Sequence, residues 1–162
     1  MTPLDLTTTI LTWLSLYGPP ALGLAALLGA LGAPMPTQLL LLTAGALAHQ
    51  GLLNPLWAVS AWMIGCAAGE GIYYLTGRYA GAWTHARQDG LLGQAWASAQ
   101  QRFIRQPSIT IFLTRFLVTP LGIPTTLIAG GSRYPYYHFL IPAVCGNLMW
   151  LAIYALPGYL LP

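Results

Sequence analysis

The sequence contains no lysine and very few charged residues of any kind. Six arginines and three acidic residues make up 6% of its 162 residues, whereas soluble domains carry about a quarter charged residues. Hydrophobic residues account for 56% of the chain. Because so few charges cannot cover a water-exposed surface, we expect an integral membrane protein. The scattered arginines, without interleaved aromatic residues, also argue against a nucleic-acid-binding patch.

The chain also lacks the motifs of metal sites and hydrolases. Its two cysteines, Cys66 and Cys145, lie in apolar stretches without metal-site spacing or a CxxC motif, so we expect them to be packing residues. The three histidines have no adjacent nucleophile, and no phosphate loop, HExxH or GxSxG motif occurs. We therefore expect no enzyme activity and no metal or other cofactor. The N-terminus lacks a basic segment, so we expect no cleavable signal.

Four apolar segments are long enough to cross a bilayer as a helix, which needs roughly 20 residues. The uninterrupted segments are 53–77 and 136–161, and the broken ones are about 20–48 and 108–131. Closely spaced prolines make the breaks, at Ala33–Pro36 and Val118–Pro124. Proline removes a backbone donor and clashes with the preceding turn, so each break should end one half-helix and begin another. Such backbone is tolerated at membrane depth only inside protein or beside a polar cavity.

The arginines favour re-entrant hairpins over kinked spans at both breaks. The charged region, about 78–107, follows the first uninterrupted segment, and the positive-inside rule makes it cytoplasmic. Its charged residues are Arg78, Arg87, Arg102 and Arg105, with Asp89 as the single acid. If the second broken segment folds back, Arg133 is cytoplasmic as well. Within this region, residues 91–103 should form an interfacial helix with Trp96 and Phe103 facing lipid.

The two broken segments also resemble each other. Pro-Thr-polar-Leu follows both breaks, within residues 34–45 and 122–130, and each copy continues to Ala-Gly. Each following span places a polar residue next to a glycine, in Gly69-Glu70 and Gly146-Asn147. One uninterrupted span separates the copies, so they should have opposite orientations, as in inverted-repeat transporters. We predict an all-α membrane protein with two opposing re-entrant hairpins, two spanning helices and interfacial helices.

Two ionisable side chains fall at predicted membrane depth. Glu70 lies in the first uninterrupted span and Arg115 in the second broken segment, and a charge there is costly unless it is paired or hydrated. In one interpretation the two residues form a structural ion pair. In the other, Arg115 binds an anionic head group and Glu70 coordinates or titrates with it. Both interpretations stay open.

Polar residues near the breaks complete the candidate site. In the simpler interpretation, the threonines that follow the prolines cap the half-helices that begin there. Exposed half-helix N-termini also attract anions, so capping is compatible with phosphate binding. Arg78 should be an interfacial anchor that reaches water, and we keep it as a candidate. The candidate substrate-binding residues are Arg115, Glu70, Thr37, Gln38, Thr125, Thr126, Arg78 and Asn147.

Three stretches match motifs of one known family. Residues 65–81, GCAAGEGIYYLTGRYAG, are similar to a G-A-x-x-G-D-x-x-x-Y-x-x-G-R-x-x-G signature, with Glu70 in place of the aspartate. Residues 112–150 resemble an R-F-x-P-x-x-R…A-G…F…N-x-x-G-x-x-x-W block, and residues 34–48 resemble a P-x-P-[SG]-[ED] hairpin. Together they resemble the DedA family, the bacterial branch of the VTT-domain superfamily, over nearly the whole chain.

The resemblance implies a multi-pass protein of the bacterial inner membrane that acts as a lipid flippase or scramblase. Its ligand would be an anionic phospholipid or a polyprenyl phosphate. Gln38 replaces the acid expected at the first hairpin, and Leu121-Gly122 replaces a second arginine. The resemblance therefore supports lipid translocation without supporting proton coupling, and it leaves homo-oligomerisation open. The alternative is a non-transporting membrane organiser with a structural ion pair; a lipid-modifying enzyme ranks third because no nucleophile is evident.

Overall fold

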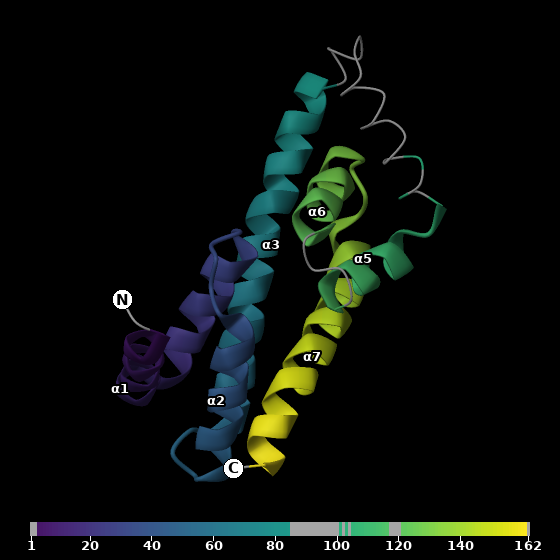
Figure 1. Ribbon diagram of the computed structural model, residues 1–162. Helices are drawn as coiled ribbons and strands as arrows, with labels where there is room; N and C mark the ends of the chain where they lie inside the picture. Colours follow the sequence, from purple (N-terminus) through teal and green to yellow (C-terminus); the bar gives the residue numbers. More distant parts are fainter. Residues whose placement is uncertain (1–2, 85–100, 102, 104, 117–120, 162) are drawn as a thin grey trace. The chain divides into compact units, whose positions relative to one another are not determined.

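The computed structural model describes residues 3–84, 101, 103, 105–116 and 121–161, and this part of the chain is helical with no strand. The expectation of an all-α protein is confirmed. The helices, labelled in Figure 1, are α1 (Pro3–Ala30), α2 (Thr37–His49), α3 (Pro55–Thr84), α5 (Pro107–Phe116), α6 (Gly122–Gly131) and α7 (Tyr136–Leu160).

The first predicted break is present between α1 and α2. α1 ends at Ala30 and α2 begins at Thr37, which leaves the Ala33–Pro36 segment without helix. α1 itself is kinked at Gly18, whose φ of 53° lies in the left-handed region that favours glycine. The break therefore separates two helices, as the prolines predict.

The second break is shorter than the sequence predicts. α5 ends at Phe116 and α6 already begins at Gly122, while residues 117–120 lie outside the described part of the chain. Pro124 lies in the first turn of α6, where the backbone N–H that proline lacks would have no helical partner. A proline there starts the helix without breaking it.

The predicted capping role of the threonines is wrong. The residues at the capping positions are Pro36 before α2 and Leu121 before α6, and neither helix start has a side-chain capping hydrogen bond. Thr125 and Thr126 lie inside α6 because that helix begins three residues before Thr125. Their side chains are therefore placed one turn into the helix.

The predicted interfacial helix at 91–103 falls almost entirely outside the described residues, as do Trp96, Arg87, Asp89 and Arg102. Phe103 is described, and the expectation that it faces lipid is wrong. Only 3% of its surface is exposed, and its ring lies edge-on against Tyr134 at 5.6 Å between centroids. The apolar surface of Phe103 is covered by protein.

The chain divides into two compact units, Met1–Gly69 with Leu148–Pro162, and Glu70–Asn147. Each unit contains one helix pair, α1 with α2 or α5 with α6, together with parts of α3 and α7. The buried core of the first unit is Leu22, Ala25, Ala26, Leu40, Leu41, Ala44, Leu53, Ala58, Trp62 and Cys66. That of the second unit is Tyr74, Phe103, Ile111, Ala129, Phe139 and Ala143.

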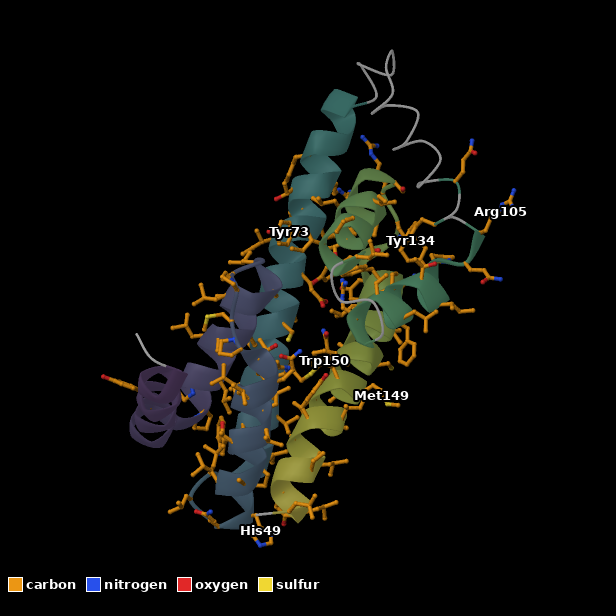
Figure 2. The ribbon with its side chains drawn as sticks, viewed as in Figure 1. His49, Tyr73, Arg105, Tyr134, Met149 and Trp150 are labelled. Atoms are coloured by element: carbon orange, nitrogen blue, oxygen red, sulfur yellow. The ribbon has the colours of Figure 1, made fainter. Side chains whose placement is uncertain are left out.

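Large hydrophobic side chains cover the outside of the helices. Ile64 and Ile141 are 69% and 67% exposed, and Met149, labelled on α7 in Figure 2, is 45% exposed. Among the described residues, α7 alone is long and apolar enough to cross a membrane by length and composition. α3 contains all but the first two residues of the predicted span 53–77, but its mean hydropathy is too low to meet that criterion. Extensive exposed apolar surface is the pattern expected where lipid or another protein covers the helices.

Candidate functional site

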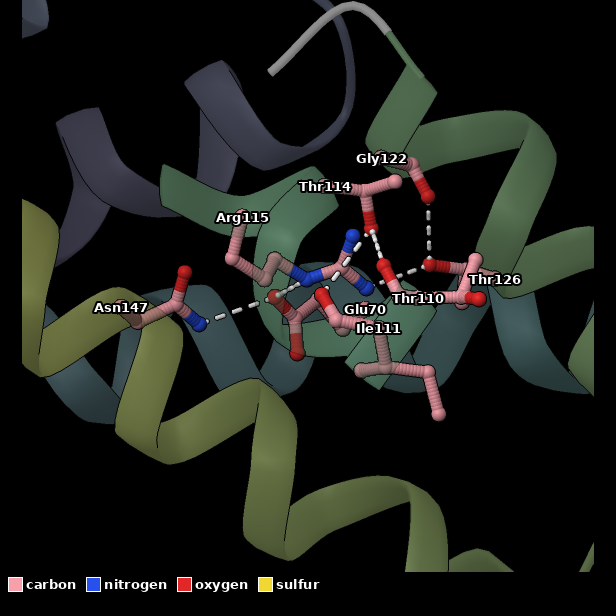
Figure 3. Close-up of polar contacts among 8 residues, drawn as sticks. All are labelled: Glu70, Thr110, Ile111, Thr114, Arg115, Gly122, Thr126 and Asn147. Atoms are coloured by element: carbon pink, nitrogen blue, oxygen red, sulfur yellow. Dashed lines mark hydrogen bonds and ion pairs between the residues drawn. The ribbon is translucent and has the colours of Figure 1, made fainter. Parts of the chain in front are cut away.

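The second unit contains a buried ion pair between α3 and α5. Glu70 is 8% exposed and Arg115 is 7% exposed, and Arg115 Nε lies 2.6 Å from Glu70 Oε1 (Figure 3). The two groups make an ion pair without aligned hydrogen-bond geometry at Nε. Neither charge is left alone in an apolar core, which would be strongly unfavourable. The predicted pairing of these two residues is confirmed.

α6 holds the other side of the guanidinium. Arg115 Nη2 donates a hydrogen bond to Thr126 Oγ1 at 2.6 Å, and the Thr126 hydroxyl donates to Gly122 O at 2.8 Å. The second bond fixes the rotation of the hydroxyl, so its oxygen is directed at the guanidinium. Arg115 also lies in the last turn of α5, where the helix dipole favours a cation.

α7 supplies a second partner for the carboxylate. Asn147 Nδ2 donates to Glu70 Oε1 at 2.9 Å, so the amide and the guanidinium converge on one carboxylate oxygen. Figure 3 shows these contacts arriving from different helices around Glu70. We call Glu70, Arg115, Thr126 and Asn147 the polar cluster.

Two glycines permit this arrangement. A Cβ at Gly146 would lie 2.6 Å from Arg115 Cβ and 2.9 Å from Phe112 O, so α7 contacts α5 without room for a side chain. This close approach places the adjacent Asn147 beside the cluster. A Cβ at Gly122 would lie 2.8 Å from Arg115 Nη1. Only glycine leaves the guanidinium its present position at this point of α6.

Aromatic side chains line the apolar side of the polar cluster. Arg115 Cζ lies 5.7 Å from the centroid of the Phe139 ring, within cation–π distance. The Phe139 ring packs against Tyr74 and Tyr136 at 5.5 and 6.1 Å between centroids. The Tyr74 hydroxyl donates to the backbone carbonyl of Tyr134. The cluster therefore lies against a group of packed aromatic rings.

The structure brings together four of the eight predicted site residues: Glu70, Arg115, Thr126 and Asn147. Thr125 is buried on α6, and Arg78 is exposed on α3, as expected of an interfacial anchor. Thr37 and Gln38 begin α2 in the other unit. Sequence reasoning missed Gly122 and Phe139 as site residues, although both lie in stretches that match family motifs. It noted Gly146 as a neighbour of Asn147 and as a match to a family motif, without assigning it a role in the site.

The described residues offer ion-pairing and hydrogen-bonding groups more than reactive ones. No three His, Cys, Asp or Glu side chains among them are arranged to hold a metal ion. The chemistry of the polar cluster is that of one cation, one carboxylate, one amide and one hydroxyl. A guanidinium is suited to planar, bidentate recognition of phosphate or carboxylate.

Comparison with known proteins gives consistent matches. The family model of the VTT domain matches residues 35–160. An uncharacterized membrane protein of Synechocystis is 32% identical over 149 residues, which cover 90% of this chain and 66% of the relative. One from Buchnera aphidicola is 28% identical over 157 residues, 93% of this chain and 60% of the relative. Inner membrane protein YabI of Escherichia coli is 27% identical over 137 residues, 82% and 52%.

This chain therefore spans between about half and two thirds of the length of these curated relatives. No solved structure matches it.

Proposed function

The chain belongs to the VTT-domain family of membrane proteins, which includes the DedA proteins, and on this premise we propose that it moves an anionic lipid head group across a bilayer. The lipid is a phospholipid or a polyprenyl phosphate, and the protein acts as a flippase or scramblase, without a catalytic reaction. The proposal includes a multi-pass location in the bacterial inner membrane, since the E. coli relative is named an inner membrane protein.

The observation that carries this proposal is the buried Arg115. An arginine that is 7% exposed in a chain with 6% charged residues is costly to keep, and its described partners are a carboxylate, a hydroxyl and an aromatic ring. Intramembrane charges of this kind mark substrate pathways more often than they stabilise a fold. A phosphate presents the same kind of oxygen acceptor as the Glu70 carboxylate. We propose that the head group takes the place of Glu70 on Arg115.

This exchange has a structural requirement. When the phosphate replaces Glu70, the carboxylate loses its cation and must be rehydrated or find another donor. Asn147 keeps one hydrogen bond to it, or turns its amide to the phosphate. The second unit must therefore open to water during transport, since both charged residues are buried in the closed arrangement.

We also propose that each broken segment is a re-entrant hairpin. The non-helical residues between α1 and α2, and the separate helices α5 and α6, support it. In a background without Cys66 and Cys145, cysteines placed at Met35 and Leu121 should react with water-soluble maleimide from within the membrane region. Residues that flank each hairpin should react from one side of vesicles. Labelling of the two flanks from opposite sides would contradict the hairpins.

A structural role for the ion pair is the second candidate, and one observation favours it. Glu70, Arg115, Thr126 and Asn147 satisfy one another within the chain. In that case the protein organises the membrane or recruits partners without transporting lipid. The two candidates differ in whether the cluster must open.

Reconstitution distinguishes them. The protein is purified and reconstituted in vesicles that contain fluorescent phosphatidylglycerol, and a membrane-impermeant quencher is added outside. If the protein moves lipid from the inner leaflet, the quenched fraction should be well above that of protein-free vesicles. Arg115→Lys keeps the charge but loses the planar guanidinium. The variant should therefore still fold, but it should transport lipid more slowly than wild type. The exposed Arg105→Lys is the matched control, because Arg105 is not a candidate binding residue, and it should transport like wild type. If wild-type and protein-free vesicles behave alike, the transport proposal is wrong.

A further inference from the structure

Two glycines bring α2 and α7 into backbone contact in the first unit. A Cβ at Gly45 would lie 2.9 Å from Tyr159 N and still closer to Ala155 O, and one at Gly158 would collide with the backbone of Leu42. The glycine of each helix therefore packs on the residue three positions before the glycine of the other.

The second unit repeats this contact atom for atom between α6 and α3. A Cβ at Gly130 would lie 2.9 Å from Arg78 N and closer to Tyr74 O, and one at Gly77 would collide with the backbone of Leu127. The three-residue spacings are the same as in the first unit. α6 therefore corresponds to α2, and this part of α3 corresponds to the end of α7.

A third glycine contact extends the correspondence to α1 and α5. A Cβ at Gly65 would lie 3.0 Å from Ala26 Cβ and collide with Gly23 O, whereas one at Gly146 would lie 2.6 Å from Arg115 Cβ and 2.9 Å from Phe112 O. In both cases a Cβ added to the glycine would meet the carbonyl oxygen of one residue and the Cβ of the residue three positions further along the same helix. Gly146 thus corresponds to Gly65, and the sequence-based pairing of Gly146 with Gly69 is four residues out of register.

Independent contacts fix the same register. Gly65 and Gly146 are 81 residues apart, and so are Gly77 and Gly158. The register of α1 and α5 follows from the third contact, and that of α2 and α6 from the first two. Positions on α3, α5 and α6 therefore have counterparts on α7, α1 and α2.

The counterparts of the polar cluster are all apolar. They are Ala26 for Arg115, Leu151 for Glu70, Leu41 for Thr126 and Cys66 for Asn147. Ala26 and Leu41 are each 2% exposed, Cys66 is 8% exposed, and Leu151 packs against them in the core of the first unit. The fold is repeated in the two units, but the polar groups are not.

Side-chain volume is redistributed to match. The first unit has alanine where the second has Arg115, and it has the large Trp62 where the second has the small Ala143. Trp62 is 3% exposed and Ala143 is 0% exposed, so both are fully packed. Ala26 and Trp62 belong to the same core in the first unit. The large ring of Trp62 there offsets the volume lost where Ala26 stands in place of an arginine, as close packing requires. The first unit is thus a filled apolar version of the same core.

We propose that each chain has one anion-binding site, formed by the polar cluster of the second unit, and that the first unit binds no head group. This inference rests on the proposed function. An anion in the first unit would find no cation and no amide or hydroxyl donor among the counterpart positions, and an unpaired charge in an apolar core is strongly unfavourable. The two units therefore differ: the second binds the head group, whereas the first has a packed apolar core at the corresponding positions.

The test is binding stoichiometry with exchanged residues. Native mass spectrometry is carried out on the full chain in detergent with dioctanoyl phosphatidylglycerol, in the presence of excess dioctanoyl phosphatidylcholine to occupy unspecific lipid positions. Wild type should saturate at one anionic lipid per chain. Asn147→Cys imports the residue of the first unit and should weaken this binding at least tenfold. Cys66→Ser, the matched change in the first unit, should leave it unchanged.

Thermal unfolding of the same samples shows whether each variant is folded. If Cys66→Ser destabilises the chain too far, Leu41→Met replaces it, with the same expectation. Two anionic lipids per chain, or equal loss of binding in the Asn147 and first-unit variants, would overturn the inference and leave the proposed function intact. Binding of one lipid without transport in vesicles would support the inference and contradict the proposed function. No selective binding would overturn both.

Discussion

Removing one partner of the Glu70–Arg115 pair should destabilise the protein more than removing the charge of both. Arg115→Met keeps most of the apolar volume of the side chain but leaves Glu70, 8% exposed, with Asn147 as its remaining described partner. Breaking a buried pair in this way costs about 3–5 kcal/mol. Each kcal/mol shifts Tm by about 2–4 °C at this chain length, so Tm should fall by roughly 6–20 °C.

Glu70→Gln should also destabilise the protein, because it leaves the buried Arg115 guanidinium without its carboxylate partner. The hydrogen bond to Thr126 and the contact with the Phe139 ring still stabilise the guanidinium in part, which reduces the loss. The double variant, Glu70→Gln with Arg115→Met, removes both charges of the pair and retains an acceptor for Asn147. Its loss of stability should be smaller than that of Arg115→Met alone, so the coupling energy, about 2–3 kcal/mol, should exceed the cost of Glu70→Gln alone.

The assay is thermal unfolding of the four proteins in detergent, followed by circular dichroism. Arg78→Met is the control, because the same substitution at an exposed arginine should change stability by less than about 0.5 kcal/mol. If the double variant loses the full sum of the two single losses, the residues are not energetically paired and the reasoning fails.

Three further changes test the surroundings of the polar cluster and, at Trp62, the core of the first unit. Gly146→Ala forces a Cβ to within 2.6 Å of Arg115 Cβ and should cost about 1–3 kcal/mol of stability in the same unfolding assay. Gly71→Ala is the control and should not destabilise the protein, because its Cβ would meet nothing nearer than 3.6 Å. Thr126→Val removes the acceptor of Nη2 and should cost about 1–3 kcal/mol and slow lipid transport in vesicles. Trp62→Phe removes a buried N–H that has no partner among the described residues and should stay within about 1 kcal/mol of wild-type stability, since the lost ring volume and the removed orphan donor offset each other.

The sequence was informative where local chemistry decides the structure. Pro34 and Pro36 predict the end of one helix and the start of another because proline acts within a single turn. Glu70 and Arg115 are identifiable because a charge is conspicuous in so apolar a chain. Their pairing follows from electrostatics without knowledge of the fold.

The remaining features depend on packing between distant segments. From the sequence, Pro124 predicts a break in a helix. In the structure it lies in the first turn of α6, which is known only because α6 begins at Gly122. Phe103 reads as a lipid-facing residue, yet Tyr134, some thirty residues away, covers it. The register of the two units is set by backbone contacts at Gly65 and Gly146, which a comparison of short motifs misplaced by one turn.

The family assignment came from motifs, and the matched region 35–160 bears it out. Transport, the lipid and the sidedness of the membrane stay predictions. They concern water, lipid and motion, which no motif in a single chain encodes.

The most direct test of the central claim, that the polar cluster carries the head group, is lipid translocation by the double variant Glu70→Gln with Arg115→Met. This protein lacks both buried charges and should be folded, which thermal unfolding verifies before reconstitution. In vesicles with fluorescent phosphatidylglycerol, the account predicts wild-type translocation well above background and double-variant translocation at background. A folded double variant that moves the lipid at the wild-type rate would contradict the account.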